Sequence, residues 1–423
     1  MLRLLAGQLT PLETTVATQA VASSLGGEVP ECFSFASPRR ALLVEEATGG
    51  DEDEWVLHAI MEALDEANTE AYPSDPVLVA PCCEQPTLLT EEIAIAAVEE
   101  ARCNVIDEYG LRQPVEELPL DDWEPSQAVP VVNALIDGAP FDWGWDASSV
   151  VALDGVVDED LRADLLSLLA GPDYAADAER GADPQIWQDG VFSDTMQNRA
   201  VGAGLGLDPS CLEELCAGPP DGASPPPVLR LQARLAKLVR AANEERVDVC
   251  RMPQSCLGEE VTPLAANAPK ASDGAECYGW HIDADPALLP PSPWTDCYGR
   301  YPNRAPGKPR FVSALVYLSK EWQWPDWGAP TEFLDPPTGE VLAVPPAPGR
   351  VVLLDQDISH SVTAPNPAAG ERPRYSLVLK CVMHPRAGPT QRVALARDEW
   401  GAPLCVGSAA APPPGGHAGD SST

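Results

Sequence analysis

The segment Cys277-Tyr278-Gly279-Trp280-His281-Ile282-Asp283-Ala284-Asp285 holds one of only five histidines in this chain of 423 residues. Because residues two apart in a strand point to the same face, an extended segment here directs the His281 imidazole and the Asp283 carboxylate toward one point. A second histidine, His360, follows the apolar run 351–354. Two imidazoles and one carboxylate are a ligand set suited to a divalent metal such as iron. These segments predict a metal site formed by His281, Asp283 and His360.

A predicted strand at 374–380 supplies a candidate anchor for an anion. Alternation places Arg374 and Ser376 on one face of this strand. The planar guanidinium of an arginine pairs with a carboxylate through two hydrogen bonds, and a neighbouring hydroxyl adds a further donor. Tyr317, in a predicted strand at 310–319, can donate to the same carboxylate. The pattern favours a deep pocket that holds the far end of a dicarboxylate.

The order of these motifs resembles the 2-oxoglutarate/Fe(II) dioxygenase superfamily, and within it the prolyl 4-hydroxylase-like branch. The resemblance covers about residues 148–387 and is strongest from 277 to 382. The segments that carry it are His281-x-Asp283, 316–322, 331–334, Gly349-Arg350, His360-x-Val362 and Arg374-x-Ser376.

The resemblance implies a fold, a reaction and a set of residue roles. It implies Fe(II) bound by His281, Asp283 and His360, and 2-oxoglutarate held by Arg374 with help from Tyr317 and Ser376. O2 is then the second co-substrate, and ascorbate is a candidate additional cofactor. The implied reaction hydroxylates a C–H bond of a prolyl or other protein side chain, or of a small molecule, and releases succinate and CO2. An acidic ligand at 283 favours hydroxylation over halogenation, for which related enzymes carry a small residue there.

Several other residues are candidates for these roles, because they lie on the same face of their strand as the residues named above. Asp285 is an alternative to Asp283, although it precedes Pro286. Arg372 and Lys380 are alternatives to Arg374, with Lys380 expected at a solvated strand end. His384 is expected at the surface. The chain also departs from close relatives, because Ala329-Pro330 stands where they often have a glycine pair, so substrate contacts cannot be transferred.

The basic segment 298–310 has two interpretations. It holds Arg300, Arg304, Lys308 and Arg310 in an otherwise acidic chain. It is either a lid that contacts an anionic substrate or a loop that neutralises nearby carboxylates. The tryptophans at 322, 324 and 327 either wall the site or pack beneath the loop, and packing is the simpler interpretation.

The order of predicted elements indicates an α+β protein with a double-stranded β-helix, or jelly roll, supported by helices. The expected helices span 158–169 and 227–245. The expected strands span 150–157, 310–319, 331–334, 340–344, 350–355 and 374–382. We expect three parts: an acidic region of unknown role at 1–145, the dioxygenase domain at 146–390, and a tail at 391–423 that is disordered from about 409.

The region before 146 matches no family pattern. Helices are expected over 51–64 and 90–109, where Gly110 provides a stop signal. Short strands are expected at 41–44 and 77–79. Residues 111–148 are rich in acidic residues, Pro and Trp, and are expected to form a linker or an irregular covering segment.

Charge and cysteine content narrow the partners and the compartment. The net charge of −38 disfavours a nucleic acid or an anionic membrane as a partner. The chain has twelve cysteines without a C-x-x-C motif, so mostly reduced thiols are expected, with Cys82-Cys83 as a candidate redox pair. No apolar run approaches the ~20 residues that span a bilayer. We expect a cytoplasmic protein, with organelle targeting as the alternative, and inert roles for His58 and His417.

Two other functions compete with the dioxygenase. A non-catalytic jelly roll could retain the metal site and act as an acidic binding module. A hydrolase could use zinc or another metal at the same triad. Arg374 and Ser376 argue against both, because neither needs an anchor for a dicarboxylate. Succinate production distinguishes the dioxygenase from the other two.

Overall fold

The computed structural model describes residues 33–34, 43–44, 103, 105–115, 122–136, 147–170, 204–207, 225–253, 263–273, 276–386 and 391–406. The chain divides into two compact units. The larger one comprises 113–254, 258–288 and 301–423, and contains every residue predicted to bind metal or 2-oxoglutarate. The expected helix at 51–64, the strand at 77–79, His58, the Cys82-Cys83 pair, His417 and the tail beyond 406 lie outside the described residues.

The larger unit is built on two β-sheets. The main sheet has the strand order β15-β3-β4-β12-β9-β14-β7-β5, with β6 also paired to β14, and the minor sheet has the order β11-β10-β13-β8. All neighbours pair antiparallel except β15 and β3. The main-sheet strands are β3 (Val129–Ile136), β4 (Ser148–Asp154), β5 (Gly204–Leu207), β6 (Val247–Arg251), β7 (Leu264–Asn267), β9 (Arg310–Tyr317), β12 (Val351–Asp355), β14 (Ser376–Pro385) and β15 (Leu404–Val406). The minor-sheet strands are β8 (Glu276–His281), β10 (Thr331–Leu334), β11 (Val341–Val344) and β13 (His360–Thr363).

Strand alternation divides the main sheet into an inner and an outer face. On β9, Leu315 and Tyr317 join an apolar cluster with Phe333 and Val344 of the minor sheet. Their neighbours Ala314 and Val316 join the cluster that includes the helices. The inner face is therefore the one toward the minor sheet, and β9 is buried along its whole length because both of its faces are covered. The fold is a jelly roll with supporting helices, as predicted.

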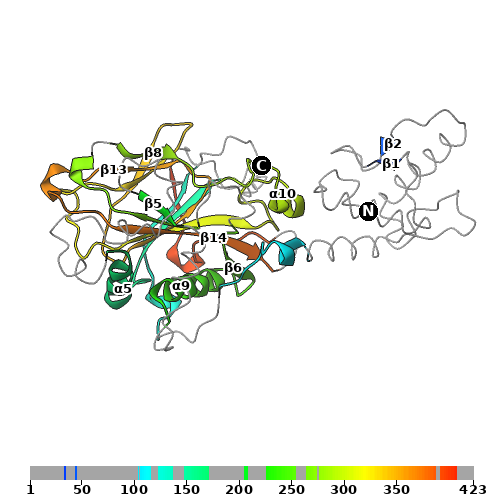
Figure 1. Cartoon of the computed structure of the whole chain (residues 1–423), viewed down its shortest axis with the longest axis horizontal. Coiled ribbons are helices and arrows are strands. Elements are labelled where there is room, and N and C mark those ends of the chain that lie inside the picture. Colours follow the sequence, from blue (N-terminus) through cyan, green and yellow to red (C-terminus); the bar gives the residue numbers. More distant parts are fainter. Residues whose placement is uncertain are drawn as a thin grey trace, which may run out of the picture. The chain divides into compact units, whose positions relative to one another are not determined.

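Helices α5 (Glu159–Ala170) and α9 (Pro227–Ala242) cover the outer face. In Figure 1 they lie on one side of the main sheet, with β8 and β13 on the other. Asp158 caps α5 by accepting from the Leu161 N–H, and its carboxylate also pairs with Arg234 of α9 at 2.6 Å. The helix predicted at 227–245 ends earlier, because the Asn243 side chain binds the Val239 carbonyl and the following Glu244 has a φ of 51°.

The expectation of an irregular segment at 111–148 is wrong for residues 129–136. These residues form β3, which pairs with β4 along its length. The sequence did not indicate this strand, because proline is rare inside strands and Pro130 lies near its start. The first half of the strand is also exposed, and buried residues alternate with less buried ones only near its end. β15, within the predicted C-terminal tail, adds to the other edge of β3. The compact unit starts at Gln113, and we propose this boundary in place of 145/146.

Removing residues 1–112 is expected to leave a cooperatively folded protein, whereas removing 1–145 is not. The longer deletion removes β3, including the fully buried Ala134 and Ile136, and exposes an edge of the long strand β4. We expect a thermal midpoint lower by about 10 °C or more, with aggregation. Thermal unfolding and size-exclusion chromatography of the two truncated chains test this, and equal behaviour would contradict the structural role of β3.

The smaller unit comprises 1–112, 255–257 and 289–300. Its described part includes the β1–β2 pair (Phe33–Ser34 with Leu43–Val44) and α10 (Pro293–Tyr298), capped by Ser292. Residues 105–108 are helical and Gly110 has a φ of 58°, which agrees with the predicted end of the 90–109 helix. Among the described residues, no helix combines the length and apolar character needed to cross a bilayer.

Candidate metal centre

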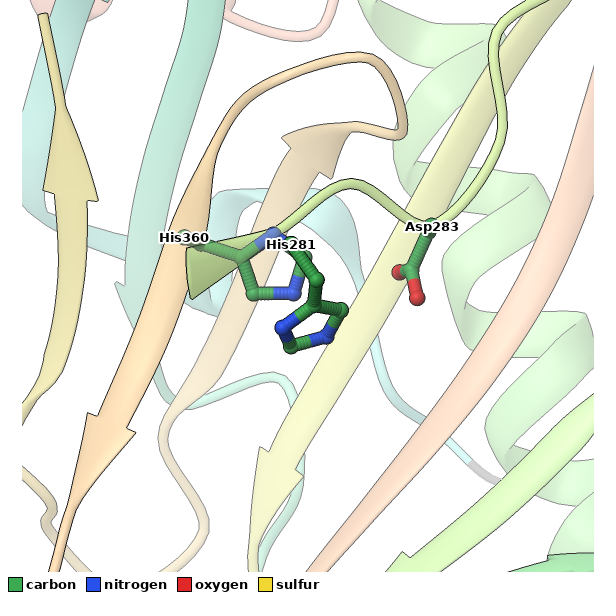
Figure 2. Close-up of side chains that lie close together, drawn as sticks. All are labelled: His281, Asp283 and His360. Atoms are coloured by element: carbon green, nitrogen blue, oxygen red, sulfur yellow. The ribbon is translucent and has the colours of Figure 1, made fainter. Parts of the chain in front are cut away.

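Two strand ends of the minor sheet bring the predicted metal ligands together. His281 ends β8 and His360 begins β13, and the two residues are direct partners across the antiparallel pair. Their ring centroids lie 4.3 Å apart. Asp283 follows in the loop after β8, where its N–H donates to the Gln356 carbonyl at 2.8 Å. One ligand atom from each side chain lies within 4.8 Å of the others, and Figure 2 shows the three groups side by side.

Backbone carbonyls orient both imidazoles. Nδ1 of His281 lies 2.8 Å from the Gly279 carbonyl, and Nδ1 of His360 lies 3.1 Å from the Ile358 carbonyl. A carbonyl only accepts, so each Nδ1 carries a proton, and in the neutral ring Nε2 keeps its lone pair. This arrangement is typical of metal-binding histidines, whose second nitrogen is fixed by a hydrogen bond. Both rings therefore fit the predicted role.

The main sheet supplies two partners to the Asp283 carboxylate. Lys380 of β14 places its Nζ 2.8 Å from Asp283 Oδ1, and Ser313 of β9 donates to Oδ2 at 2.5 Å. Burial by itself raises the pKa of Asp283, but the Lys380 charge, the neighbouring His360 and these hydrogen bonds together hold the pKa below its ordinary value. The carboxylate is ionised, as a metal ligand must be.

His360 is held in its neutral form. Burial is the largest cause that lowers its pKa to about 4, and the neighbouring His281 and Lys380 act in the same direction, against the opposing effect of Asp283. A neutral imidazole is the form that binds a metal. His360 is buried and His281 is exposed, so His360 lies on the interior side of the site and His281 on its solvent side.

A second polar cluster surrounds Arg374, immediately before β14. Its side chain is 1% exposed, and Nη2 donates to Thr331 Oγ1 at 2.8 Å, while Ser376 Oγ lies 3.4 Å from Nη1. The Tyr317 hydroxyl is 2.7 Å from Thr331 Oγ1, and the guanidinium lies 4.7 Å from the Tyr317 ring centroid. Within the described part of the chain, no carboxylate pairs with Arg374. An uncompensated buried charge is costly, so the cluster is suited to an anionic ligand.

The two clusters share the inner face of the main sheet. Ser313 is paired with Lys380, and Tyr317 with Ser376, on the adjoining strands β9 and β14. These pairs are four residues apart on each strand, or roughly 13 Å along the sheet. The predicted metal ligands and the predicted anchor residues therefore line one continuous surface between the two sheets.

The alternative candidates have other surroundings. Asp285 Oδ1 accepts from the Ala287 N–H in a turn, and burial raises the pKa of Asp285. Arg372 donates to the Ala369 carbonyl and lies over the Trp327 ring, 5.0 Å from its centroid. The predictions of surface positions for Lys380 and His384 are wrong, since these side chains are 5% and 3% exposed. Neighbouring strands bury both ends of β14, which the pattern of this strand alone does not reveal.

In the larger unit, two basic residues of the segment 298–310 pair with carboxylates. Arg304 Nη1 contacts both Asp357 oxygens at 2.7 Å, and the buried Arg310 binds both Asp355 oxygens at 2.7 Å. Lys308 lies 5.6 Å from the Tyr301 ring centroid. These contacts favour the charge-neutralising interpretation over the lid.

The tryptophans beside β10 pack against each other and the chain. Trp322 donates its indole N–H to the Gly328 carbonyl at 2.9 Å and meets the Trp327 ring edge-on at 5.4 Å between centroids. Trp327 is 5% exposed, whereas Trp324 is 45% exposed. The packing interpretation therefore describes Trp322 and Trp327.

Arg310→Leu is expected to lower the free energy of unfolding by about 3 kcal/mol, because it removes the closest charge partner of the buried Asp355 carboxylate and leaves only Arg304, at 3.7 Å. Urea denaturation measures this change. Arg246→Leu is the matched control, since it removes an arginine from an exposed pair with Glu244, and about 1 kcal/mol or less is expected. Equal effects of the two substitutions would contradict a structural role for the Arg310–Asp355 pair.

Three residues of the site were not assigned from the sequence. Thr331 begins β10 and binds both Tyr317 and Arg374, while Ser313 and Lys380 bind Asp283. Strand parity was an available signal for two of them: Ser313 shares the face of Tyr317, and Lys380 shares the face of Ser376. Thr331 lies on the other sheet, so only the packing of the two sheets reveals its role.

Comparison with known proteins agrees with this geometry. Residues 269–379 match the sequence family described as the 2OG-Fe(II) oxygenase superfamily. The match spans β8, β13 and Arg374, and so contains both clusters. The comparison with curated proteins finds no match.

Several solved structures show low similarity to the chain. A prolyl hydroxylase from Trichoplax adhaerens, in complex with a hypoxia inducible factor oxygen degradation domain peptide fragment, is 16% identical over 55% of this chain and 82% of its own, with a TM-score of 0.32. A Pseudomonas putida prolyl-4-hydroxylase is 16% identical over 56% and 93%, with a TM-score of 0.28. The non-heme alpha ketoglutarate dependent epimerase SnoN from nogalamycin biosynthesis is 14% identical over 58% and 89%, with a TM-score of 0.31.

Similarities at this level contribute nothing to the assignment of a substrate. The family match implies Fe(II), 2-oxoglutarate and O2, and the donor set of two imidazoles and one ionised carboxylate fits Fe(II). The buried guanidinium of Arg374, which has no carboxylate partner among the described residues, fits a carboxylate co-substrate. Residues 269–379, which hold both clusters, are thus similar in sequence to the 2OG-Fe(II) oxygenase superfamily.

Proposed function

We propose that this protein is a 2-oxoglutarate-dependent hydroxylase with iron bound by His281, Asp283 and His360. The observation that carries the proposal is Arg374, a guanidinium 1% exposed and without a carboxylate partner among the described residues, on the same inner face as the metal cluster. A metal-dependent hydrolase or a bare scaffold gives such a residue no function. A co-substrate with a carboxylate at its far end does.

Each residue then has a defined task. Arg374 pairs with the distal carboxylate of 2-oxoglutarate, and Ser376, Tyr317 and Thr331 provide hydroxyls around it. His281, Asp283 and His360 would hold the iron as three protein ligands. When bound, iron and 2-oxoglutarate supply the oxidising chemistry that converts O2 into a hydroxylating agent, with succinate and CO2 as products. The apolar inner face of the main sheet limits access of water to this chemistry.

His281 is exposed, so the metal cluster can be reached from the β8 side. We propose that the substrate is a prolyl or other protein side chain, or a small molecule. A nucleic acid does not suit a chain with a net charge of −38. The cytoplasmic location stays a prediction.

An anaerobic titration followed by oxygen tests the proposed function. Fe(II) and 2-oxoglutarate are added to the whole protein without O2, and a weak metal-to-ligand charge-transfer band is expected in the visible spectrum. O2 is then admitted, with ascorbate to keep the iron reduced, and succinate is measured. Succinate formation without a primary substrate supports the dioxygenase. A folded protein that gives neither the band nor succinate contradicts it and favours the binding module.

A further inference from the structure

A buried lysine lies beside the carboxylate of the metal cluster. Lys380 is 5% exposed, and its Nζ lies 2.8 Å from Asp283 Oδ1. Ser313, directly opposite Lys380 on the neighbouring strand, donates to Asp283 Oδ2 at 2.5 Å. Both carboxylate oxygens are therefore held from the inner face of the main sheet, one by an ammonium and the other by a hydroxyl.

The charge of this lysine opposes the binding of a cation. The ligand set of His281, Asp283 and His360 carries one negative charge, and the ammonium beside Asp283 offsets it. When a divalent metal is bound, its charge already compensates the buried Asp283 carboxylate. The positive charge of Lys380 is then not needed for that purpose. Burying a lysine is itself costly. Its position therefore indicates an effect on the metal site.

The two donors also restrict how Asp283 can bind. A carboxylate can bind a metal through one oxygen or both, and the second oxygen takes a position that a co-substrate needs. Lys380 engages Oδ1 and Ser313 engages Oδ2, so fewer lone pairs are available to a metal. The rigid pairing of β14 with β9 fixes both donors relative to each other.

We propose that Lys380 is a positioning residue of the metal centre. Together with Ser313, it keeps Asp283 a ligand that binds the metal through one oxygen, and its positive charge lowers the affinity of the site for the metal. This inference rests on the proposed function, because it assigns the cluster to a metal. Its consequence is a site that keeps its co-substrate positions open and exchanges its metal more readily than the bare ligand set would. Lys380 acts through Asp283 and does not need to contact the substrate.

Metal-binding measurements without turnover test this role. We would titrate the full chain with Mn²⁺ and record the visible spectrum of the Co²⁺ form, for wild type, Lys380→Met and Lys380→Gln. Lys237→Met is the matched control: Lys237 also pairs with a carboxylate, Glu124 at 2.7 Å, but belongs to α9 on the outer face of the main sheet. It removes one positive charge without touching the cluster.

The expected results distinguish the effect of the Lys380 charge on metal affinity from its effect on how Asp283 binds the metal. Lys380→Met is expected to bind Mn²⁺ about tenfold or more tightly than wild type, since a nearby positive charge is removed. Its Co²⁺ spectrum is expected to change, because Oδ1 becomes free to coordinate. Lys380→Gln is expected to bind Mn²⁺ more tightly with a spectrum closer to wild type, since its amide can still donate to Oδ1. Lys237→Met is expected to match wild type in both measurements.

Unchanged or weaker Mn²⁺ binding by Lys380→Met overturns the proposal, and a lower melting temperature of the metal-free variant then leaves Lys380 a structural role alone. If Lys380→Met does not fold, Lys380→Gln decides by the same criterion. A wild-type protein that binds no Mn²⁺ overturns both this inference and the proposed metal centre. A wild-type protein that binds Mn²⁺ but forms no succinate with Fe(II) overturns only the proposed hydroxylase.

Discussion

Asp283→Asn is expected to abolish succinate formation and to weaken Fe(II) binding by about two orders of magnitude or more. The substitution removes the only carboxylate of the cluster, leaving two imidazoles as ligands. Loss of one charged ligand interaction costs roughly 3 kcal/mol or more, which corresponds to a factor above 100 in affinity. Asparagine is nearly isosteric and can still accept from Ser313, so the loop conformation should persist. Fe(II) titration and a succinate assay measure the two effects.

Asp285→Asn is the matched control for this substitution. Asp285 lies two residues further along and was a competing candidate ligand, but its Oδ1 accepts from the Ala287 N–H. Activity and Fe(II) affinity close to wild type are expected. If instead Asp285→Asn is inactive and Asp283→Asn retains turnover, the ligand assignment has to move to Asp285. His281→Ala is expected to abolish turnover in the same way, and full turnover in that variant would remove the metal assignment.

Arg374→Ala is expected to raise the KM for 2-oxoglutarate by about ten- to a hundredfold, because roughly 1.5–3 kcal/mol of charge-assisted hydrogen bonding is lost. Fe(II) affinity should change little, since Arg374 contacts Thr331 and Ser376 and none of the metal ligands. The split between these two quantities distinguishes an anchor from a residue that supports the whole fold. Initial rates of succinate formation at varied 2-oxoglutarate give the KM.

Arg372→Ala is the control for Arg374→Ala. Arg372 lies two residues earlier, contacts the Ala369 carbonyl and the Trp327 ring, and should leave the KM near the wild-type value. Arg374→Lys is expected to recover part of the binding, because a lysine supplies the charge without the two-pronged geometry. An unchanged KM in Arg374→Ala would transfer the anchor to another cation and remove the main support for the proposed function.

Features that depend on local pattern were predictable from the sequence. Alternation identified β9, β10, β12 and β14 to within a few residues, and the acidic start at 158–160 marked α5. The His281-x-Asp283 motif and His360 were correctly expected to lie close together, because each lies at or just beyond the end of a strand of the same sheet. The roles of these residues in catalysis stay predictions.

Features that depend on packing between distant segments were not predictable. Lys380 was assigned to the correct face of β14, yet its burial and its pairing with Asp283 depend on the loop after β8, almost a hundred residues earlier (380 − 283 = 97). Thr331 joins the Arg374 cluster only because the minor sheet faces the main one. β3 was missed because Pro130 and its exposed first half resemble a loop. In each case the decisive neighbour lies on another strand.

The parallel pairing of β15 with β3 has a consequence for how the protein is made. β3 (Val129–Ile136) leaves the ribosome early, and its partner on one side, β4, follows directly. Its other edge pairs with residues 404–406, so that edge stays open until about 270 further residues have been synthesised (404 − 136 = 268). At ~5–20 residues per second this interval lasts roughly 13–54 seconds. During it, β3 presents an unpaired strand edge to other nascent chains, and closure by β15 removes it.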